Sequence, residues 1–181
     1  MRIVVHMKLA VVFGRLAAIL LCVAMAAEAA ARELRHPGPG VPAFTVQVPD
    51  NWAHQVTDDN LVVVSEDRTM SIVVAFWTHA GSLEEAAKTM LEGGGATAPT
   101  GKTPASISGL PGFSFDSTAK SSKEQPLQVK LTVVRVGTRV CGSVTKFELT
   151  SNSPEQRQLA DTVMQSVRII GAPAPTGAKQ R

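Results

Sequence analysis

The stretch GGGATAPTGKT, residues 93–103, is the first candidate for chemistry, because Lys102 and Thr103 end a loose form of the phosphate-binding P-loop pattern. A P-loop needs a strand before its glycines and a helix after its Lys-Thr pair, since the helix N-terminus holds the phosphate. Here a helix pattern comes before the glycines, Ala96 replaces the first glycine of the motif, and Pro104 follows the threonine. We therefore interpret the stretch as a loop from a helix to a strand and expect no nucleotide binding.

A hydrolase would need a nucleophile with a positioned base beside it. The sequence GFSFD, Gly112 to Asp116, resembles a nucleophile elbow, but Asp116 stands where the closing glycine belongs. The segment also lies between strand patterns, whereas an elbow joins a strand to a helix. A hydrolase is therefore the least favoured function class, and we name no catalytic residue.

Histidines and acidic residues give no metal-binding pattern. The histidines beyond the N-terminal segment are His36, His54 and His79. None has the close His or Cys spacing that zinc requires, so we interpret His54 and His79 as surface residues. Four acidic residues fall in predicted turns: Asp58, Asp59, Glu66 and Asp67. These residues could hold calcium weakly, but they lack the spaced ligand pattern of a calcium loop. We expect no metal and no cofactor.

The pair Trp77 and His79 is the one candidate for a ligand or partner groove. Trp77 ends an apolar strand pattern and His79 follows two residues later. Buried aromatic residues dominate core energetics, so we expect both Trp52 and Trp77 to be core residues. A groove at the strand end beside Trp77 and His79, for a small ligand or a metal ion, stays open as the alternative.

The N-terminal segment has the order of a secretory signal peptide. Basic residues precede the uncharged apolar run LAAILLCVAMAA at residues 16–27, and small residues of the A-x-A form follow it. The run is shorter than the ~20 residues that a stable membrane span needs. We expect residues 1–31 to be a signal peptide cleaved after Ala29 or Ala31. Lipidation of Cys22 is not expected, because the residue before it is Leu21 and not a small residue. Cys22 then leaves with the cleaved segment. An uncleaved membrane anchor is the alternative.

Removal of this segment would change the charge and the cysteine count of the chain. The net charge falls from +3 to +1, because Arg2, Lys8 and Arg15 leave together with Glu28. A nearly neutral chain has no electrostatic reason to hold nucleic acid. Cys141 is then the only cysteine, so no internal disulfide can form. We interpret it as a small buried apolar residue, with a reactive thiol or an intermolecular bridge as the alternative.

Alternating apolar residues predict strands on both sides of a helix. The first four lie at 44–48, 53–57, 61–65 and 70–78, and the later four lie at 102–109, 113–116, 127–133 and 139–150. Tight turns join most of them, so the sheet should be mainly antiparallel. The continuous apolar run SIVVAFW within 70–78 predicts a strand that is covered on both faces.

Two helices have clear start signals. Ser82 and Glu85 form a capping box before an apolar face, and three glycines from Gly93 end this helix. The second helix opens at Ser153, with Pro154 at its first position. Each helix has one apolar face to bury against the sheet, so the fold class is α+β.

The chain beyond the signal peptide has about 150 residues, the length of one domain. Residues 32–43 and 171–181 are rich in proline and glycine, and we expect a disordered linker and a disordered tail there. A single domain should span residues 44–170.

The run FTVQVPDNW, Phe44 to Trp52, resembles the opening of the PsbP/Mog1/DcrB-like group of proteins. The SLEEA helix start at 82–86, the hairpin at 134–140 and the SVR helix end at 166–168 are similar to that group as well. The resemblance covers residues 41–170. It implies an α-β-α sandwich around an antiparallel sheet and a non-enzymatic role as an accessory or adaptor protein. No functional residue carries over from it.

Together these features predict a secreted, periplasmic accessory or binding protein that acts through contacts with an envelope or periplasmic protein. We expect no nucleic acid or nucleotide partner and no stable membrane span after signal cleavage. A small-ligand or metal-ion binder at Trp77 and His79 is the alternative.

Overall fold

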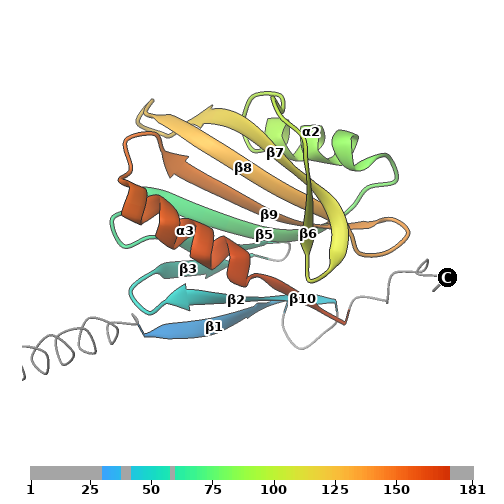
Figure 1. Cartoon of the computed structure of the whole chain (residues 1–181), viewed down its shortest axis with the longest axis horizontal. Helices are drawn as coiled ribbons and strands as arrows, with labels where there is room; N and C mark the ends of the chain where they lie inside the picture. Colours follow the sequence, from blue (N-terminus) through green and yellow to red (C-terminus); the bar gives the residue numbers. More distant parts are fainter. Residues whose placement is uncertain (1–29, 38–41, 58–59, 172–181) are drawn as a thin grey trace, which may run out of the picture. The chain divides into compact units, whose positions relative to one another are not determined.

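The structure, a computed structural model, describes residues 30–37, 42–57 and 60–171. These residues form two sheets and two helices (Figure 1). The elements in chain order are β1 (Ala31–His36), β2 (Ala43–Pro49), β3 (Ala53–Val56), β4 (Asn60–Val64), β5 (Met70–Thr78), α2 (Leu83–Gly93), β6 (Thr103–Ile107), β7 (Leu110–Lys120), β8 (Pro126–Arg135), β9 (Val140–Leu149), α3 (Pro154–Ser166) and β10 (Arg168–Ile170).

The larger sheet has seven strands in the order β3-β4-β5-β9-β8-β7-β6, and every neighbouring pair in it is antiparallel. Helix α2 contacts β7 and β8 on one face, and α3 contacts β5 and β9 on the other face (Figure 1). Helix α3 also contacts β2 of the smaller sheet, whose order is β1-β2-β10. The predicted α+β class, with helices on both faces of an antiparallel sheet, is confirmed.

Each face of the large sheet has its own core. On the α3 side the core joins residues of β2, β4 and β5, such as Phe44, Leu61 and Ile72, to Val163 of α3. On the α2 side Ala86, Ala87 and Leu91 of the helix lie on Leu131 and Val133 of β8. Strand alternation divides the side chains between the two cores, because successive residues point to opposite faces.

Both helix starts follow the predicted capping chemistry. The Ser82 hydroxyl accepts the Glu85 amide at 3.2 Å, while Glu85 Oε2 accepts the Ser82 amide at 2.9 Å. Ser153 and Gln156 form the same reciprocal pair at the start of α3. Helix α2 ends at Gly93 with Gly94 as its C-cap, as the glycine run predicts.

Three expectations about the strands are wrong. The proline-rich segment 32–43 is not all linker, since residues 31–36 form β1 beside β2. The strands form two sheets instead of one, because β10, which the sequence pattern did not predict, pairs with β2 at Ile169 and Phe44. The apolar run of β5 predicts full cover on both faces, but on the α2 side only Ala75 is buried, while Val73 and Trp77 are half-buried.

The expected signal peptide and tail lie outside the described residues, apart from Ala30, Ala31 and Gly171. Within the described residues, no helix combines the length and the apolar character needed to cross a membrane.

Candidate functional site

The α2 side of β5 is an apolar surface that the fold covers only in part. Met70, Ile72 and Val74 point into the α3-side core. The residues between them point to the α2 side, where α2 packs mainly on β7 and β8 and meets β5 at Trp77, beside Thr89 and Met90. We use the name β4–β5 face for the half-buried residues exposed there: Val62, Val64, Val73, Trp77 and Phe147.

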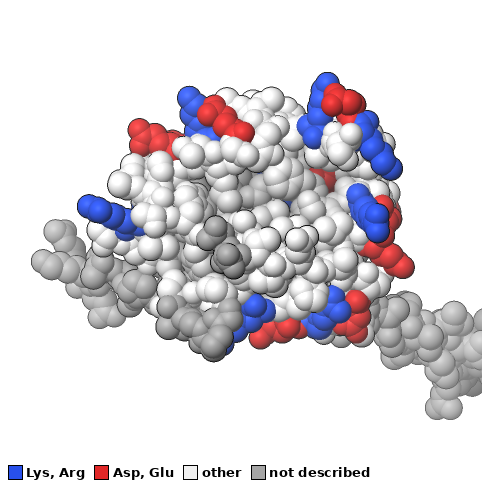
Figure 2. Space-filling model, turned by 180° about the vertical axis from the view of Figure 1, so that it is seen from behind, with Lys and Arg blue, Asp and Glu red and all other residues white. Residues whose placement is uncertain are grey.

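Cross-strand pairing makes this face continuous. Val62 lies opposite Val73 in the β4–β5 register, and Ser71 lies between Val64 and Phe147. Figure 2 views the α2 side of the molecule, where the Lys, Arg, Asp and Glu side chains lie mostly around the border and few of them lie in the middle. Apolar surface that is rimmed by polar residues is typical of sites for protein or ligand contact.

Trp77 and His79 of the predicted groove do not share one cavity. Trp77 is half-buried and lines a hollow of about 400 Å³ with Asn60, Thr89 and Met90, while His79 is not part of that lining. The His79 carbonyl accepts a hydrogen bond from the Arg135 guanidinium, and His79 Nε2 is buried with no hydrogen-bond partner in the described part of the chain. The groove therefore stays a prediction, with Trp77 as its better-supported half.

Trp52 is 3% exposed and belongs to the core, as predicted. His54 is exposed on β3, as a surface histidine should be, whereas His36 is buried on β1. In the part of the chain that the structure describes, no three His, Cys, Asp or Glu residues gather in a way that could hold a metal ion. The acidic residues Asp58 and Asp59 lie outside the described residues.

Asp67 acts as an acceptor that organises the β4–β5 turn. It accepts hydrogen bonds from the Ser65 hydroxyl at 2.6 Å, from the Thr69 amide at 3.1 Å and from the Gln156 side chain at 2.7 Å. These bonds, that of Ser65 first, lower the pKa of the Asp67 carboxyl because they favour its charged form. The same carboxylate ties the turn to the start of α3.

The loop that contains Lys102 and Thr103 runs from α2 to β6, in the order opposite to a P-loop. Lys102 contacts the Glu84 carboxylate and lies 3.9 Å from the centre of the Phe113 ring. The Gly112 to Asp116 segment lies inside β7, so it forms no strand-to-helix elbow. Neither stretch has the geometry of the motif that it resembles.

Cys141 is fully buried on the α2 side of β9. Burial raises the pKa of its thiol, and the charge of Arg135 offsets part of that effect. A buried thiol with a raised pKa is a poor nucleophile. This environment agrees with the interpretation of Cys141 as a small apolar core residue.

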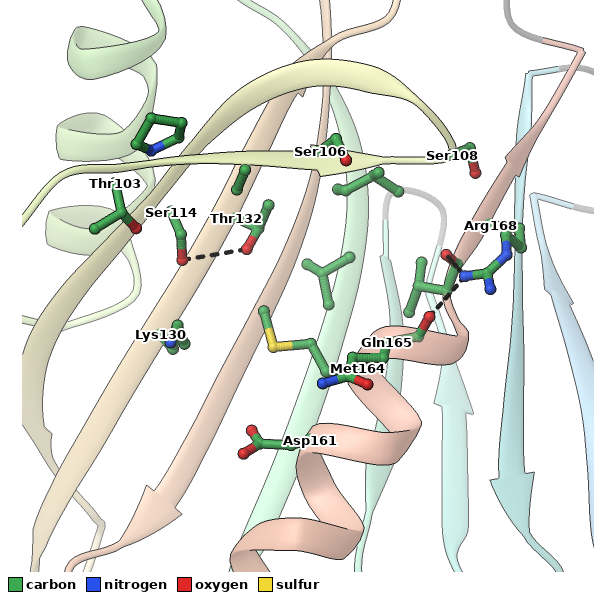
Figure 3. Close-up of a pocket in the computed structure, with 15 residues that line it drawn as sticks. Thr103, Ser106, Ser108, Ser114, Lys130, Thr132, Asp161, Met164, Gln165 and Arg168 are labelled. Carbon is green, nitrogen blue, oxygen red and sulfur yellow. Dashed lines mark hydrogen bonds between the residues drawn. The ribbon is translucent and has the colours of Figure 1, made fainter.

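On the opposite face of the sheet, a groove of about 450 Å³ lies between β6 and the C-terminal half of α3 (Figure 3). Ser114 and Thr132 line its floor, Lys130 and Asp161 lie along one side, and Met164 projects into it from the helix. Sequence reasoning did not identify this groove. Its signal in the sequence is the polar half of the alternation on β7 and β8, where Ser114, Lys130 and Thr132 fall between apolar residues.

No protein-family model matches the sequence, and a search of curated proteins finds no match. Solved structures do match. LpqN of Mycobacterium tuberculosis, described as involved in cell envelope biogenesis, has a TM-score of 0.54 at 15% identity, over 79% of this chain and 92% of that chain. The Saccharomyces cerevisiae Ran-binding protein Mog1p has a TM-score of 0.53 at 13% identity, over 79% of this chain and 97% of that chain.

Cyanobacterial PsbP (CyanoP) from Synechocystis sp. PCC 6803 has a TM-score of 0.56 at 10% identity, over 80% of this chain and 95% of that chain. The chain has the Mog1/PsbP-like fold. The resemblance that begins at the FTVQVPDNW run is confirmed at the level of fold. At these low sequence identities, the shared Mog1/PsbP-like fold does not give the function. The function of the β4–β5 face and of the groove between β6 and α3 must be argued from their own residues.

Proposed function

We propose that this protein is a non-enzymatic accessory or binding protein outside the cytoplasm, and that it holds a protein partner on the β4–β5 face. The observation that carries the proposal is the incomplete cover of β5 on its α2 side. A strand with an apolar run on both faces normally lies between two layers. Here the second layer is incomplete among the described residues, so Val62, Val73 and Trp77 are half-buried and available to an external partner.

The composition of the face supports a protein as the occupant. Aromatic and aliphatic residues without charges form the centre of protein interfaces, and polar residues form the rim. Trp77 and Phe147 are the side chains most suited to act as anchors, since aromatic residues dominate binding energy at such centres. Both side chains pack against the core cluster that contains residues of α2, so they lie next to this helix.

The location outside the cytoplasm rests on the signal-peptide pattern of residues 1–31. Two proteins of the same fold support the general role: LpqN is described by its involvement in cell envelope biogenesis, and Mog1p by its binding of Ran. Neither description names a reaction.

Cross-linking of the protein in its native envelope, followed by mass spectrometry, tests the proposal. We expect one dominant protein partner, and we expect Val73→Lys to abolish its capture because a charge would be buried in the interface. Leu159→Lys is the matched control, since Leu159 is an apolar residue of α3 that is 40% exposed away from this face. Equal capture by both variants would contradict the proposal.

A small ligand beside Trp77 is the second candidate, because the hollow of about 400 Å³ there has the volume of a ligand site. Trp77 fluorescence would respond to such a ligand, and the Trp77→Phe variant would remove that response. Fluorescence that no candidate ligand changes would count against it.

A further inference from the structure

The groove between β6 and α3 has a chemistry different from that of the β4–β5 face. Helix α3 covers β5 and β9 on this side of the sheet, and among the described residues no helix covers β6 to β8 on the same side. Its volume of about 450 Å³ falls within the usual range for small-ligand sites. Its lining combines hydroxyl groups and charges with an apolar strip made by Ile107, Val144 and Met164.

Two buried hydroxyls lie next to each other in the floor of the groove. Ser114 is 7% exposed and Thr132 is 8% exposed. Thr132 Oγ1 donates to Ser114 Oγ at 3.3 Å (Figure 3). The proton of the Ser114 hydroxyl itself has no acceptor among the described residues. A buried donor without an acceptor costs free energy, so donation by the Ser114 hydroxyl to a bound group would be favourable.

Among the charged side chains that line the groove, the one without an interaction partner is positive. Asp161 is engaged by Lys146, whose Nζ lies 2.6 Å from Asp161 Oδ1. Arg168 Nη1 donates to the carbonyls of Gln165 and Val167 at 2.6 and 2.9 Å. Lys130 has no hydrogen bond or ion pair with any described residue, although Asp116 lies opposite it in the strand register. One ammonium group of the groove lining is therefore free, on the strand that also carries Thr132 (Figure 3).

We propose that this groove binds a small carboxylate with a compact apolar group. Lys130 and Ser114 would hold the carboxylate oxygens, and the apolar group would lie against Val144 and Met164. One ammonium and one hydroxyl match the two oxygens of a carboxylate, since each oxygen then receives a charge-assisted hydrogen bond. The site is independent of the protein-contact function, because it lies on the other face of the sheet.

Two sources offer this chemistry: a free branched carboxylic acid, and the C-terminus of a peptide with an apolar last residue. The probes are 4-methylpentanoate and N-acetyl-alanyl-leucine, each with its amide as the matched neutral control. Binding is followed by NMR chemical shifts of the protein, purified after export so that it carries its natural N-terminus. We expect an acid to bind with a Kd on the order of 1 mM and its amide to bind at least tenfold more weakly.

The variant Lys130→Gln should weaken acid binding by about tenfold to a hundredfold, because a charge-assisted bond is lost. Lys123→Gln makes the same change in the exposed 121–125 loop and should leave binding unchanged. Ser114→Ala should weaken the acid more than the amide, because only the bond to the carboxylate is charge-assisted. Binding of the peptide acid alone would assign the site to chain termini, and binding of the free acid alone would assign it to small molecules. Equal binding of acid and amide, no binding of either acid, or an unaffected Lys130→Gln variant would overturn the proposal.

Discussion

Lys146 offers the sharpest test of how α3 is held on the sheet. Its side chain is 6% exposed, and its Nζ lies 3.2 Å from Glu148 Oε1 and 2.6 Å from Asp161 Oδ1. Glu148 belongs to β9 with Lys146, and its side chain is also 6% exposed. Asp161 lies on α3 and is half exposed. The lysine therefore neutralises a buried carboxylate and also contacts the helix.

The variant Lys146→Met leaves Glu148 as a buried charge without its cation. Breaking a buried ion pair in this way costs about 3–5 kcal/mol. For a domain of this size, each kcal/mol lowers the melting temperature by about 2–4 °C, so a fall of roughly 10 °C is expected. Asp161→Asn keeps the Lys146–Glu148 pair and removes a solvent-screened contact, so its cost should be about 1 kcal/mol or less.

Equilibrium unfolding in urea, followed by both circular dichroism and tryptophan fluorescence, measures these differences. The double variant Lys146→Met, Glu148→Leu is the decisive control, since an apolar pair of similar volume can replace a buried ion pair with little loss. It should recover most of the stability that the single variant loses. A double variant as unstable as Lys146→Met, or a Lys146→Met cost below about 1 kcal/mol, would refute the reasoning.

Three further predictions concern single residues. Ser82→Ala and Ser153→Ala should each lower the free energy of unfolding by about 1 kcal/mol through loss of an N-cap, and urea midpoints that do not move would contradict this. Asp67→Asn should destabilise the protein at neutral pH. Since the folded pKa of Asp67 is lowered, its contribution to the free energy of unfolding is complete above the unfolded pKa of about 3.9 and is lost as the pH falls through the folded value. A stability difference between Asp67→Asn and wild type that persists in strong acid would contradict the assignment. Cys141 should react with a thiol reagent at pH 8 only in denaturant, because burial raises its pKa in the folded chain; rapid reaction of the native protein would show an accessible thiol.

Local signals in the sequence predicted the parts of the fold that depend on neighbouring residues. The capping boxes at Ser82 and Ser153 needed only residues three positions apart. The strands on either side of α2 followed from alternation, and the FTVQVPDNW run carried the resemblance to the right fold.

Pairing between distant strands could not be predicted in the same way. Strand β10 has three residues, and only its pairing with β2 defines it, about 120 positions away along the chain. The apolar run of β5 predicted burial on both faces, because hydrophobicity alone does not distinguish a core from a contact surface. Likewise, Lys130 is left without an ion-pair partner because Asp161 pairs with Lys146. The spacing of these residues in the sequence does not show which of these pairs forms.

A photoreactive amino acid placed at Val73 tests the central claim most directly. Irradiated in the native envelope, the protein should form one dominant cross-link to another protein from Val73, and none from the same group placed at Leu159 of α3. Cross-links from Leu159 alone, or none from Val73 despite normal amounts of folded protein, would contradict the claim that the β4–β5 face holds the partner.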